Sequence, residues 1–265
     1  MPEALVLLRQ DGAVRTLSLN RPAALNSFNG ELHAALRSAL NDAATDASVR
    51  CVVLTGEGRG FCAGQDLSDP RLSAHPGNPA QGLNDVLVQF YKPLILQLKA
   101  MPVPVLAAVN GVAAGAGANI ALACDVVLAK ASASFIQAFA KIGLVPDAGG
   151  SWVLPRLVGR ARALGLALLG DKLGAAEAQR IGLIWRCVDD DAFAAEVAAL
   201  AARLAAMPTS ALAQTRALLD GAQGLPLEQA LDAETRVQTA LGGAHDYAEG
   251  VAAFGAKRAA VFKDR

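Results

Sequence analysis

Two glycine-rich segments, each directly after a short apolar run, constrain the fold of this chain more than any other feature. Residues 60–67 (Gly-Phe-Cys-Ala-Gly-Gln-Asp-Leu) follow the run 51–54, and residues 110–119 (Asn-Gly-Val-Ala-Ala-Gly-Ala-Gly-Ala-Asn) follow the run 105–109. Such runs predict strands that turn sharply, and we expect each corner to lead into a helix. Amides at helix N-termini lack internal partners. Two such corners facing each other would offer two N–H donors to one oxygen, which is an oxyanion hole.

A single acidic residue lies in a third segment of unusual composition. Residues 144–150 are Leu-Val-Pro-Asp-Ala-Gly-Gly, so apolar residues and glycines surround Asp147. Two amide corners and one isolated carboxylate indicate chemistry on a carbonyl compound, whose oxygen gains negative charge while one acid/base group moves a proton. Burial by Leu144, Val145 and Phe139 is expected to raise the pKa of this carboxyl group. On composition alone, a turn or capping role for Asp147 is equally open.

Other reaction chemistries find little support in the chain. The histidines, His33, His75 and His245, have no carboxylate or cysteine at metal-ligand spacing, so we expect no metal site. Cys62 lies in the first corner, but no histidine is near it in the sequence, and a small packing residue is the simpler interpretation. The glycines at 56–60 lack the order and the terminal lysine of a phosphate-binding loop.

Composition sets the broad class of protein. The 265 residues are 53% hydrophobic and 18% charged, with a formal net charge of zero, which suits a large core in one domain or in a domain with an appendage. No basic stripe marks a nucleic-acid partner. The four cysteines are widely spaced without a CxxC pair, and the first residues form no secretory signal. We therefore expect reduced, buried thiols and a cytoplasmic protein.

An uncharged stretch at residues 100–124 has the length of a membrane span. Pro102, Pro104 and Gly111 interrupt it, which favours a short strand, a glycine corner and a buried helix. We therefore expect no membrane partner.

Apolar periodicity predicts strands that alternate with helices up to residue 188, and helices alone after it. We expect strands at 5–8, 14–19, 51–54, 104–109, 125–128 and 183–188, and helices at 29–45, 85–100, 117–124, 151–169, 174–181, 191–206, 209–221, 226–241 and 246–262. The stretch 68–84, rich in proline and glycine, is expected to be a mobile loop. The prediction is an α/β protein with a spiral core of strand–strand–helix repeats at residues 1–190 and a C-terminal helical appendage at residues 191–265.

Together these segments closely resemble the enoyl-CoA hydratase/isomerase (crotonase) superfamily, and the resemblance covers nearly the whole chain. It is carried by residues 19–26, 58–67, 111–118, 146–150, 159–170, 173–183 and 254–258. Within the family, the chain looks most like members that isomerise a ring epoxide of phenylacetyl-CoA in bacterial phenylacetate degradation. The resemblance implies the crotonase spiral fold, an acyl-CoA thioester as substrate, and a homotrimer or a dimer of trimers.

The resemblance also implies roles for individual residues. The backbone amides of Gln65 and Ala116 would form the oxyanion hole, and Asp147 would be the acid/base residue, as in isomerases of the family. Many relatives have glycine where this chain has Ala116, but an amide donates equally well from either residue. The residues implied in coenzyme A binding are Ala24, Ala63, Asp66, Leu67 and, from the last helix of this or a neighbouring subunit, Lys257.

Two positions depart from the pattern of the family's hydratases. Those enzymes hold water between two glutamates, whereas the matching positions here carry Asn119 and Phe139, which we expect to line the substrate pocket. Neither can act as a general base. The sequence therefore favours an isomerase with Asp147 as its single base and no metal or redox cofactor, since coenzyme A enters as part of the substrate.

Three alternatives to this function stay open. The first is an isomerase that moves the β,γ double bond of an aliphatic enoyl-CoA to the α,β position. The second is an enoyl-CoA hydratase that uses some other group, and the third is a non-catalytic binder of coenzyme A esters.

Overall fold

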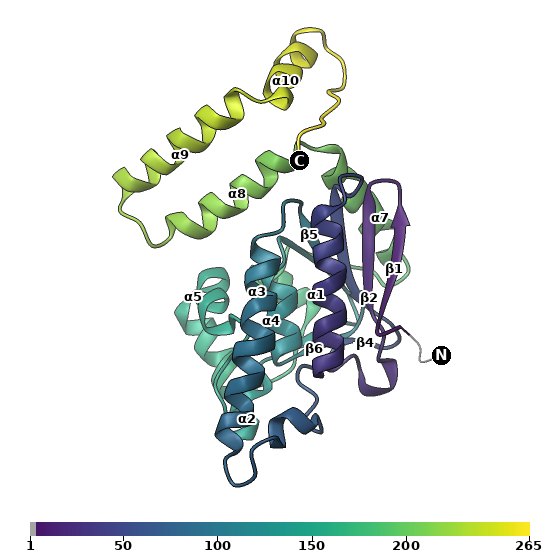
Figure 1. Cartoon of the computed structure of the whole chain (residues 1–265), viewed down its shortest axis with the longest axis vertical. Coiled ribbons are helices and arrows are strands. Elements are labelled where there is room, and N and C mark those ends of the chain that lie inside the picture. The colour runs from purple at the N-terminus through teal and green to yellow at the C-terminus, as the bar shows by residue number, and fades with distance from the viewer. Residues whose placement is uncertain (1–3) are drawn as a thin grey trace.

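Two sheets organise the fold, and the larger one carries most of the buried strands. The computed structural model describes residues 4–265 (Figure 1). Six strands lie in the order β1 (Val6–Asp11), β2 (Val14–Leu19), β3 (Cys51–Gly56), β5 (Val105–Val109), β7 (Val126–Lys130) and β10 (Arg186–Val188). β1 pairs with β2 as an antiparallel hairpin, whereas all the other neighbours are parallel. The continuous apolar run of β5 fits a parallel strand that is buried on both faces.

The smaller sheet contains four short strands. Their order is β4 (Gly60–Cys62), β6 (Val112–Ala114), β8 (Ser134–Ile136) and β9 (Leu173–Gly174). β3, β5 and β7 of the larger sheet are followed directly by β4, β6 and β8 of the smaller one, so the chain winds through both sheets in each repeat. This arrangement confirms the predicted spiral. Gly111 permits one of these turns, because a side-chain carbon there would overlap the carbonyl oxygen of Arg59.

Six helices belong to the repeats. Their bounds are α1 (Gly30–Thr45), α2 (Pro79–Val86), α3 (Lys92–Lys99), α4 (Ala116–Ala123), α5 (Gly150–Leu169) and α6 (Ala175–Arg180). Asn29 caps α1 by accepting a hydrogen bond from the backbone amide of Leu32. A π-helical turn, Leu87–Tyr91, joins α2 to α3 in the segment that was predicted as one regular helix. Such turns add a residue to the helix and are frequent at functional sites.

The stretch 68–84 is largely helical, whereas a mobile loop without helices was predicted from the sequence. It contains a 3₁₀ turn, Pro70–Ser73, and most of α2. Asp69 and Asn78 cap these two elements by accepting hydrogen bonds from backbone amides of the first turn. In both cases a proline follows the cap, where its missing N–H costs nothing because that position has no helical partner. These prolines therefore begin helices.

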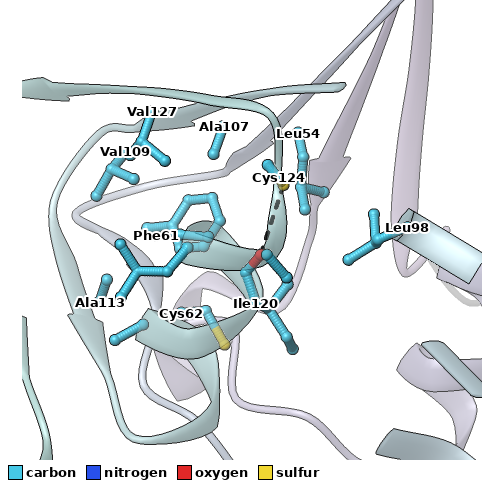
Figure 2. Packing of buried hydrophobic residues seen from close by; sticks show 14 of the residues in the cluster. Leu54, Phe61, Cys62, Leu98, Ala107, Val109, Ala113, Ile120, Cys124 and Val127 are labelled. Atoms are coloured by element: carbon cyan, nitrogen blue, oxygen red, sulfur yellow. Dashed lines mark hydrogen bonds between the residues drawn. The ribbon is translucent and has the colours of Figure 1, made fainter. Parts of the chain in front are cut away.

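The main core lies between the larger sheet and the helices α1, α3 and α4. Figure 2 shows the ring of Phe61, from β4, among Val109 and Ile120, and all three side chains are buried. Every residue of α4 is buried, which explains why the stretch 100–124 is free of charge. Among the described residues, no helix is long and apolar enough to cross a membrane. The free cysteines are Cys51, Cys62 and Cys124, which are buried, and Cys187, which is half-buried.

The first two C-terminal helices contact the core, and the last two extend from it. Their bounds are α7 (Phe193–Ala206), α8 (Thr209–Ala222), α9 (Leu227–Gly242) and α10 (His245–Gly255). Phe193 and Ala201 of α7 join a cluster with Cys51 and Leu106 of the larger sheet. By packing, α7 therefore belongs to the core, although the sequence grouped it with the appendage. α9 and α10 reach away from the sheets at the top of Figure 1, whereas ion pairs of Arg216 with Asp125 and of Asp220 with Lys99 tie α8 to the core.

The last helix ends at Gly255, several residues before its predicted end. Lys257 takes a left-handed backbone conformation (φ 51°), and the amide of Arg258 donates back into the helix, a pattern that terminates helices. Glu249 then accepts hydrogen bonds from the guanidinium of Arg258 and from the amide of Val261. The chain therefore turns back along α10 instead of continuing it.

Candidate active site

A cavity of about 180 Å³ brings together both glycine corners and the isolated aspartate. Gln65 of the first corner, Ala116 of the second corner and Asp147 all line it. The other walls are mainly apolar and come from the segment 67–91 and from residues 138–144. Segments that are far apart along the chain therefore meet at one place.

The two corners touch because their strands, β4 and β6, pair in parallel. Gly64 lies against the second corner with a left-handed backbone (φ 93°). A side-chain carbon at this position would lie 2.8 Å from the carbonyl oxygen of Ala114 and 3.4 Å from the amide nitrogen of Ala116. Glycine is required both for this conformation and for this approach. The result is that residues from both corners line the same cavity.

The backbone N–H of Gln65 is turned toward the second corner. On the opposite side, the amide of Phe28 donates to the carbonyl oxygen of Gly64 at 2.7 Å, and the amide of Asp66 donates to the carbonyl oxygen of Phe28 at 2.8 Å. Neighbouring amides of an extended segment point to opposite sides, so the N–H of Gln65 faces away from Phe28. Because the first corner continues in this extended bridge, the helix predicted directly after it is wrong.

The amide of Ala116 is the first N–H of α4, which begins after Gly115 (φ 53°). First-turn amides have no acceptor within their own helix and carry the positive end of its dipole. Within residues 4–265, neither this amide nor that of Gln65 donates to a protein oxygen. Two free N–H donors at one wall of a cavity suit an oxygen that gains negative charge.

Asp147 faces the cavity from a tight turn before α5. Its carbonyl oxygen accepts from the amide of Gly150 at 2.7 Å, and both intervening residues, Ala148 and Gly149, have left-handed backbones (φ 46° and 81°). Its carboxyl atom Oδ1 is buried and has no partner among the described residues. Burial raises the pKa of Asp147 to about 6, and this effect outweighs a backbone hydrogen bond that lowers the pKa. The carboxylate is therefore a base near neutral pH, and its protonated form stays accessible.

The expected rise in the pKa of Asp147 is confirmed. Of the three apolar residues that were expected to bury its carboxyl group, one does not. Phe139 and Leu144 line the cavity with Asp147, and Phe139 is buried. Val145 is 78% exposed and contributes no burial. Among the described residues that line the cavity, Asp147 carries the one carboxylate.

Asn119 lies behind the cavity wall and is not among the lining residues. Its prediction as a pocket residue is therefore wrong. Its side chain is fully buried. It donates through Nδ2 to the carbonyl oxygen of Asp147 at 2.8 Å, and it accepts through Oδ1 from the side-chain amide of Gln137 at 2.8 Å. A side-chain carbon at Gly150 would collide with the amide group of Asn119. Asn119 therefore supports the turn that presents Asp147.

Three of the residues implied in coenzyme A binding lie in or beside the cavity. Ala63 and Leu67 line it. Ala24, in the 3₁₀ turn Pro22–Ala24, is close in the fold because the amide of Ala63 donates to the carbonyl oxygen of the next residue, Leu25. Lys257 follows α10, which lies at the top of Figure 1, whereas β4 and β6 lie in its lower half. The fold of a single chain therefore keeps Lys257 apart from the other residues of this set.

Asp66, the remaining residue of this set, is already engaged within the protein. Its carboxylate accepts from the hydroxyl of Ser68 at 2.6 Å and forms an ion pair with Arg21 at 2.9 Å. Both contacts lower the pKa of Asp66, and the hydrogen bond from Ser68 has the larger effect. The side chain therefore shapes the loop after the first corner, and the backbone amide of Asp66 is engaged as well, by the carbonyl oxygen of Phe28.

The wall formed by α2 and the π-helical turn was not identified from the sequence. It supplies Leu83, Val86, Leu87 and Tyr91, and Leu72 of the 3₁₀ turn Pro70–Ser73 lies beside them. The spacing of Leu83, Leu87 and Tyr91 was the available signal, but any helix that packs on a core shares such a spacing.

A cluster of potential metal ligands lies at the start of α10, outside the cavity. His245, Asp246 and Asp264 each bring one ligand atom within 4.8 Å of the others. The carboxylate of Asp246 already accepts from two backbone amides near the C-terminus, one of them that of Asp264. The cluster is therefore explained by hydrogen bonds that hold the last residues of the chain against the start of α10.

Comparisons with known proteins find similar chains over nearly the whole length. A family model described as enoyl-CoA hydratase/isomerase matches residues 9–265. The chain is 49% identical, over 97% of both chains, to a 1,2-epoxyphenylacetyl-CoA isomerase of Escherichia coli (strain K12), and 48% identical, over 94% of both chains, to a probable enoyl-CoA hydratase of Rhodobacter capsulatus. A solved enoyl-CoA hydratase from Polaromonas sp. JS666 superposes with a TM-score of 0.87 at 35% identity, covering 97% of this chain and 99% of that one.

Proposed function

The chain belongs to the enoyl-CoA hydratase/isomerase family, and on that premise we propose that it isomerises an acyl-CoA thioester with a ring-epoxidised phenylacetyl group. The observation that carries the proposal is the single carboxylate, Asp147, in a cavity with mainly apolar walls. The similarity to a protein named 1,2-epoxyphenylacetyl-CoA isomerase supports this reaction. The product would contain a seven-membered oxygen ring, an oxepin, with the atomic composition of the substrate.

The thioester carbonyl would accept hydrogen bonds from the backbone amides of Gln65 and Ala116, which line the cavity together. Loss of a proton from the neighbouring α-carbon places negative charge on that oxygen. Donors that are already oriented toward the charge stabilise it without rearrangement, and each contributes about 3 kcal/mol to lowering the barrier.

Asp147 would take the α-proton and give it back at another carbon. Removal of the proton forms the enolate, and the carbon–carbon bond shared by the epoxide and the six-membered ring then opens. The proton held by Asp147 returns to a ring carbon, so the reaction needs no net proton. A pKa of about 6 suits a group that must act as a base first and as an acid afterwards.

Coenzyme A would enter as part of the substrate, and proton transfer with bond migration requires no metal or redox step. We propose that Ala24 and the backbone of residues 63–67 hold its pantetheine and adenine ends. The four free cysteines are typical of a reducing compartment, so we place the reaction in the cytoplasm.

A homotrimer or a dimer of trimers is the proposed assembly. The helices α8 to α10 expose apolar side chains, among them Leu227, Leu231 and Phe254, and with the residues after α10 they line an open, mainly apolar groove of about 440 Å³. Large exposed apolar surfaces are typical of subunit interfaces. In such an assembly, Lys257 would reach the nucleotide phosphate of coenzyme A bound to a neighbouring subunit.

A panel of three coenzyme A esters tests the proposed reaction. The ring epoxide of phenylacetyl-CoA, a β,γ-enoyl-CoA and an α,β-enoyl-CoA would be compared by kcat/KM. The ring epoxide is expected to be the best substrate. A higher value for the β,γ-enoyl-CoA would instead favour the aliphatic isomerase, since the same single base can move a double bond.

Hydration of crotonyl-CoA is expected to be slower than isomerisation of the ring epoxide by about three orders of magnitude. Water addition needs a second acid/base group, but Phe139 is apolar and the amide of Asn119 is bonded to the turn of Asp147. Loss of the enoyl absorbance on hydration provides the assay. Rapid hydration would contradict the inference from these two positions.

The pKa of Asp147 predicts the pH dependence of turnover. The carboxyl group must be ionised to accept the α-proton, and its pKa is raised to about 6. We therefore expect kcat/KM to be flat above about pH 7 and to fall about tenfold per unit below about pH 6. Initial rates would be recorded with circular dichroism at each pH to confirm folding. A rate that stays constant down to about pH 4.5 would rule out a base with this pKa.

A further inference from the structure

A tyrosine in the cavity wall is tied to one of the two proposed amide donors. Tyr91 ends the π-helical turn, lines the cavity and is 2% exposed. Its hydroxyl donates to Oε1 of Gln65 at 2.9 Å. We propose that Tyr91 is a positioning residue, which holds the side chain of Gln65 and thereby fixes the backbone N–H of Gln65 toward the thioester oxygen. This inference rests on the proposed function and adds a residue that the reaction scheme does not use.

The side chain of Gln65 is held at both ends of its amide group. While Oε1 accepts from Tyr91, Nε2 donates to the carbonyl oxygen of Asp66 at 3.2 Å. The backbone before it contains Gly64, a residue with wide conformational freedom, and the bridge to Phe28 fixes only the other edge of the segment. A tether from the cavity side therefore limits rotation of the peptide that carries the donor.

Tyr91 can serve as an anchor because aromatic rings hold it. The ring centroid of His33 lies 4.4 Å from that of Tyr91 in an edge arrangement, and the centroid of Phe28 lies 6.2 Å away. His33 also contacts Phe90, at 5.4 Å. Burial lowers the pKa of His33 to about 3, so its ring is neutral near pH 7 and packs as an aromatic group. Burial also raises the pKa of Tyr91, which keeps its hydroxyl protonated as a donor.

The substitution Tyr91→Phe removes the hydroxyl and keeps the ring. We expect kcat for the ring epoxide to fall about tenfold with KM within about twofold of the wild-type value, because a loosened donor acts on the charged oxygen more than on the bound substrate. Thr45→Val is a suitable control, since it also removes one hydroxyl group and Thr45 is an exposed residue of α1 outside the cavity, and it should keep wild-type kinetics. Wild-type kcat in Tyr91→Phe would overturn the proposal.

A spectroscopic probe separates positioning from a general loss of structure. The absorption of 4-dimethylaminocinnamoyl-CoA moves to longer wavelength when hydrogen bonds polarise its thioester carbonyl. Bound to the Tyr91→Phe protein, the probe should show a smaller shift than in the wild type, at similar affinity. A reduced kcat with an unchanged shift would show that Tyr91 acts in another way and would overturn the proposal.

A double-mutant cycle with Gln65→Leu tests whether the two side chains act as one unit. This change removes the acceptor but keeps the backbone amide. If Tyr91 acts through Gln65, the double variant should be no slower than the slower single variant, whereas multiplied losses would contradict it. If Tyr91→Phe does not fold, Gln65→Leu alone should reproduce the fall in kcat and the smaller shift. Full turnover in Asp147→Asn would instead refute the proposed reaction, independently of these results.

Discussion

Replacing Asp147 with asparagine is expected to lower kcat for the ring epoxide by about 10³- to 10⁴-fold. Asparagine has nearly the shape of aspartate but cannot accept the α-proton. The carbonyl oxygen of residue 147, which accepts from Gly150 and Asn119, is kept, so the turn should persist. Turnover would be followed at saturating substrate, and binding of phenylacetyl-CoA would be measured by calorimetry.

Binding should stay within about threefold of the wild-type value, because the proposed coenzyme A contacts and both amide donors remain. Asp171→Asn is a suitable control, since Asp171 is exposed and lies outside the cavity, and it should leave kcat unchanged. If Asp147→Asn retained more than about a tenth of the wild-type kcat, Asp147 would not be the proton carrier.

Replacing Gly64 with alanine is expected to lower kcat by about 10²- to 10³-fold, the loss typical of one oxyanion donor. The new side-chain carbon would lie 2.8 Å from the carbonyl oxygen of Ala114, so the two corners must move apart. The amides of Gln65 and Ala116 could then no longer contact the same oxygen. Steady-state kinetics would measure the loss, and the shift of the bound chromophore described above should shrink with it.

Gly12→Ala controls for backbone strain in this experiment. Gly12 also has a left-handed backbone (φ 55°), but nothing lies within 4 Å of an added carbon. Both variants should lose about 1 kcal/mol of stability from strain, whereas only Gly64→Ala should lose turnover. A folded Gly64→Ala protein with wild-type kcat would show that contact between the corners is not needed.

The parts of the fold that were predicted correctly depend on local patterns. Apolar runs that end at glycines identified β3 and β5, whereas β4 and β6 lie in segments that were predicted as corners. The alternation of strands and helices identified the spiral. The rise in the pKa of Asp147 was also predicted from its apolar neighbours. Val145 was the exception, because a turn directs some side chains to solvent whatever their polarity.

The parts that were missed depend on contacts between distant segments. Asn119 lies on α4, which is buried on all sides. The sequence of such a helix does not indicate whether the side-chain amide of Asn119 faces the cavity or the turn of Asp147. The wall that includes Tyr91 depends on a π-helical turn, which has no distinct sequence pattern. The caps Asp69 and Asn78 precede prolines, and this pattern was available for predicting helices in the stretch 68–84.

Hydrogen exchange at the α-carbon of phenylacetyl-CoA in D₂O tests the proposed proton transfer most directly. This compound has α-hydrogens but no epoxide, so after deprotonation it can only take a proton back. Proton NMR should show deuterium entering the α-position with the wild-type protein, much more slowly with Gly64→Ala and not measurably with Asp147→Asn. Equal exchange in the wild type and Asp147→Asn, or no exchange in a wild-type protein that converts the ring epoxide, would contradict an enolate formed by Asp147.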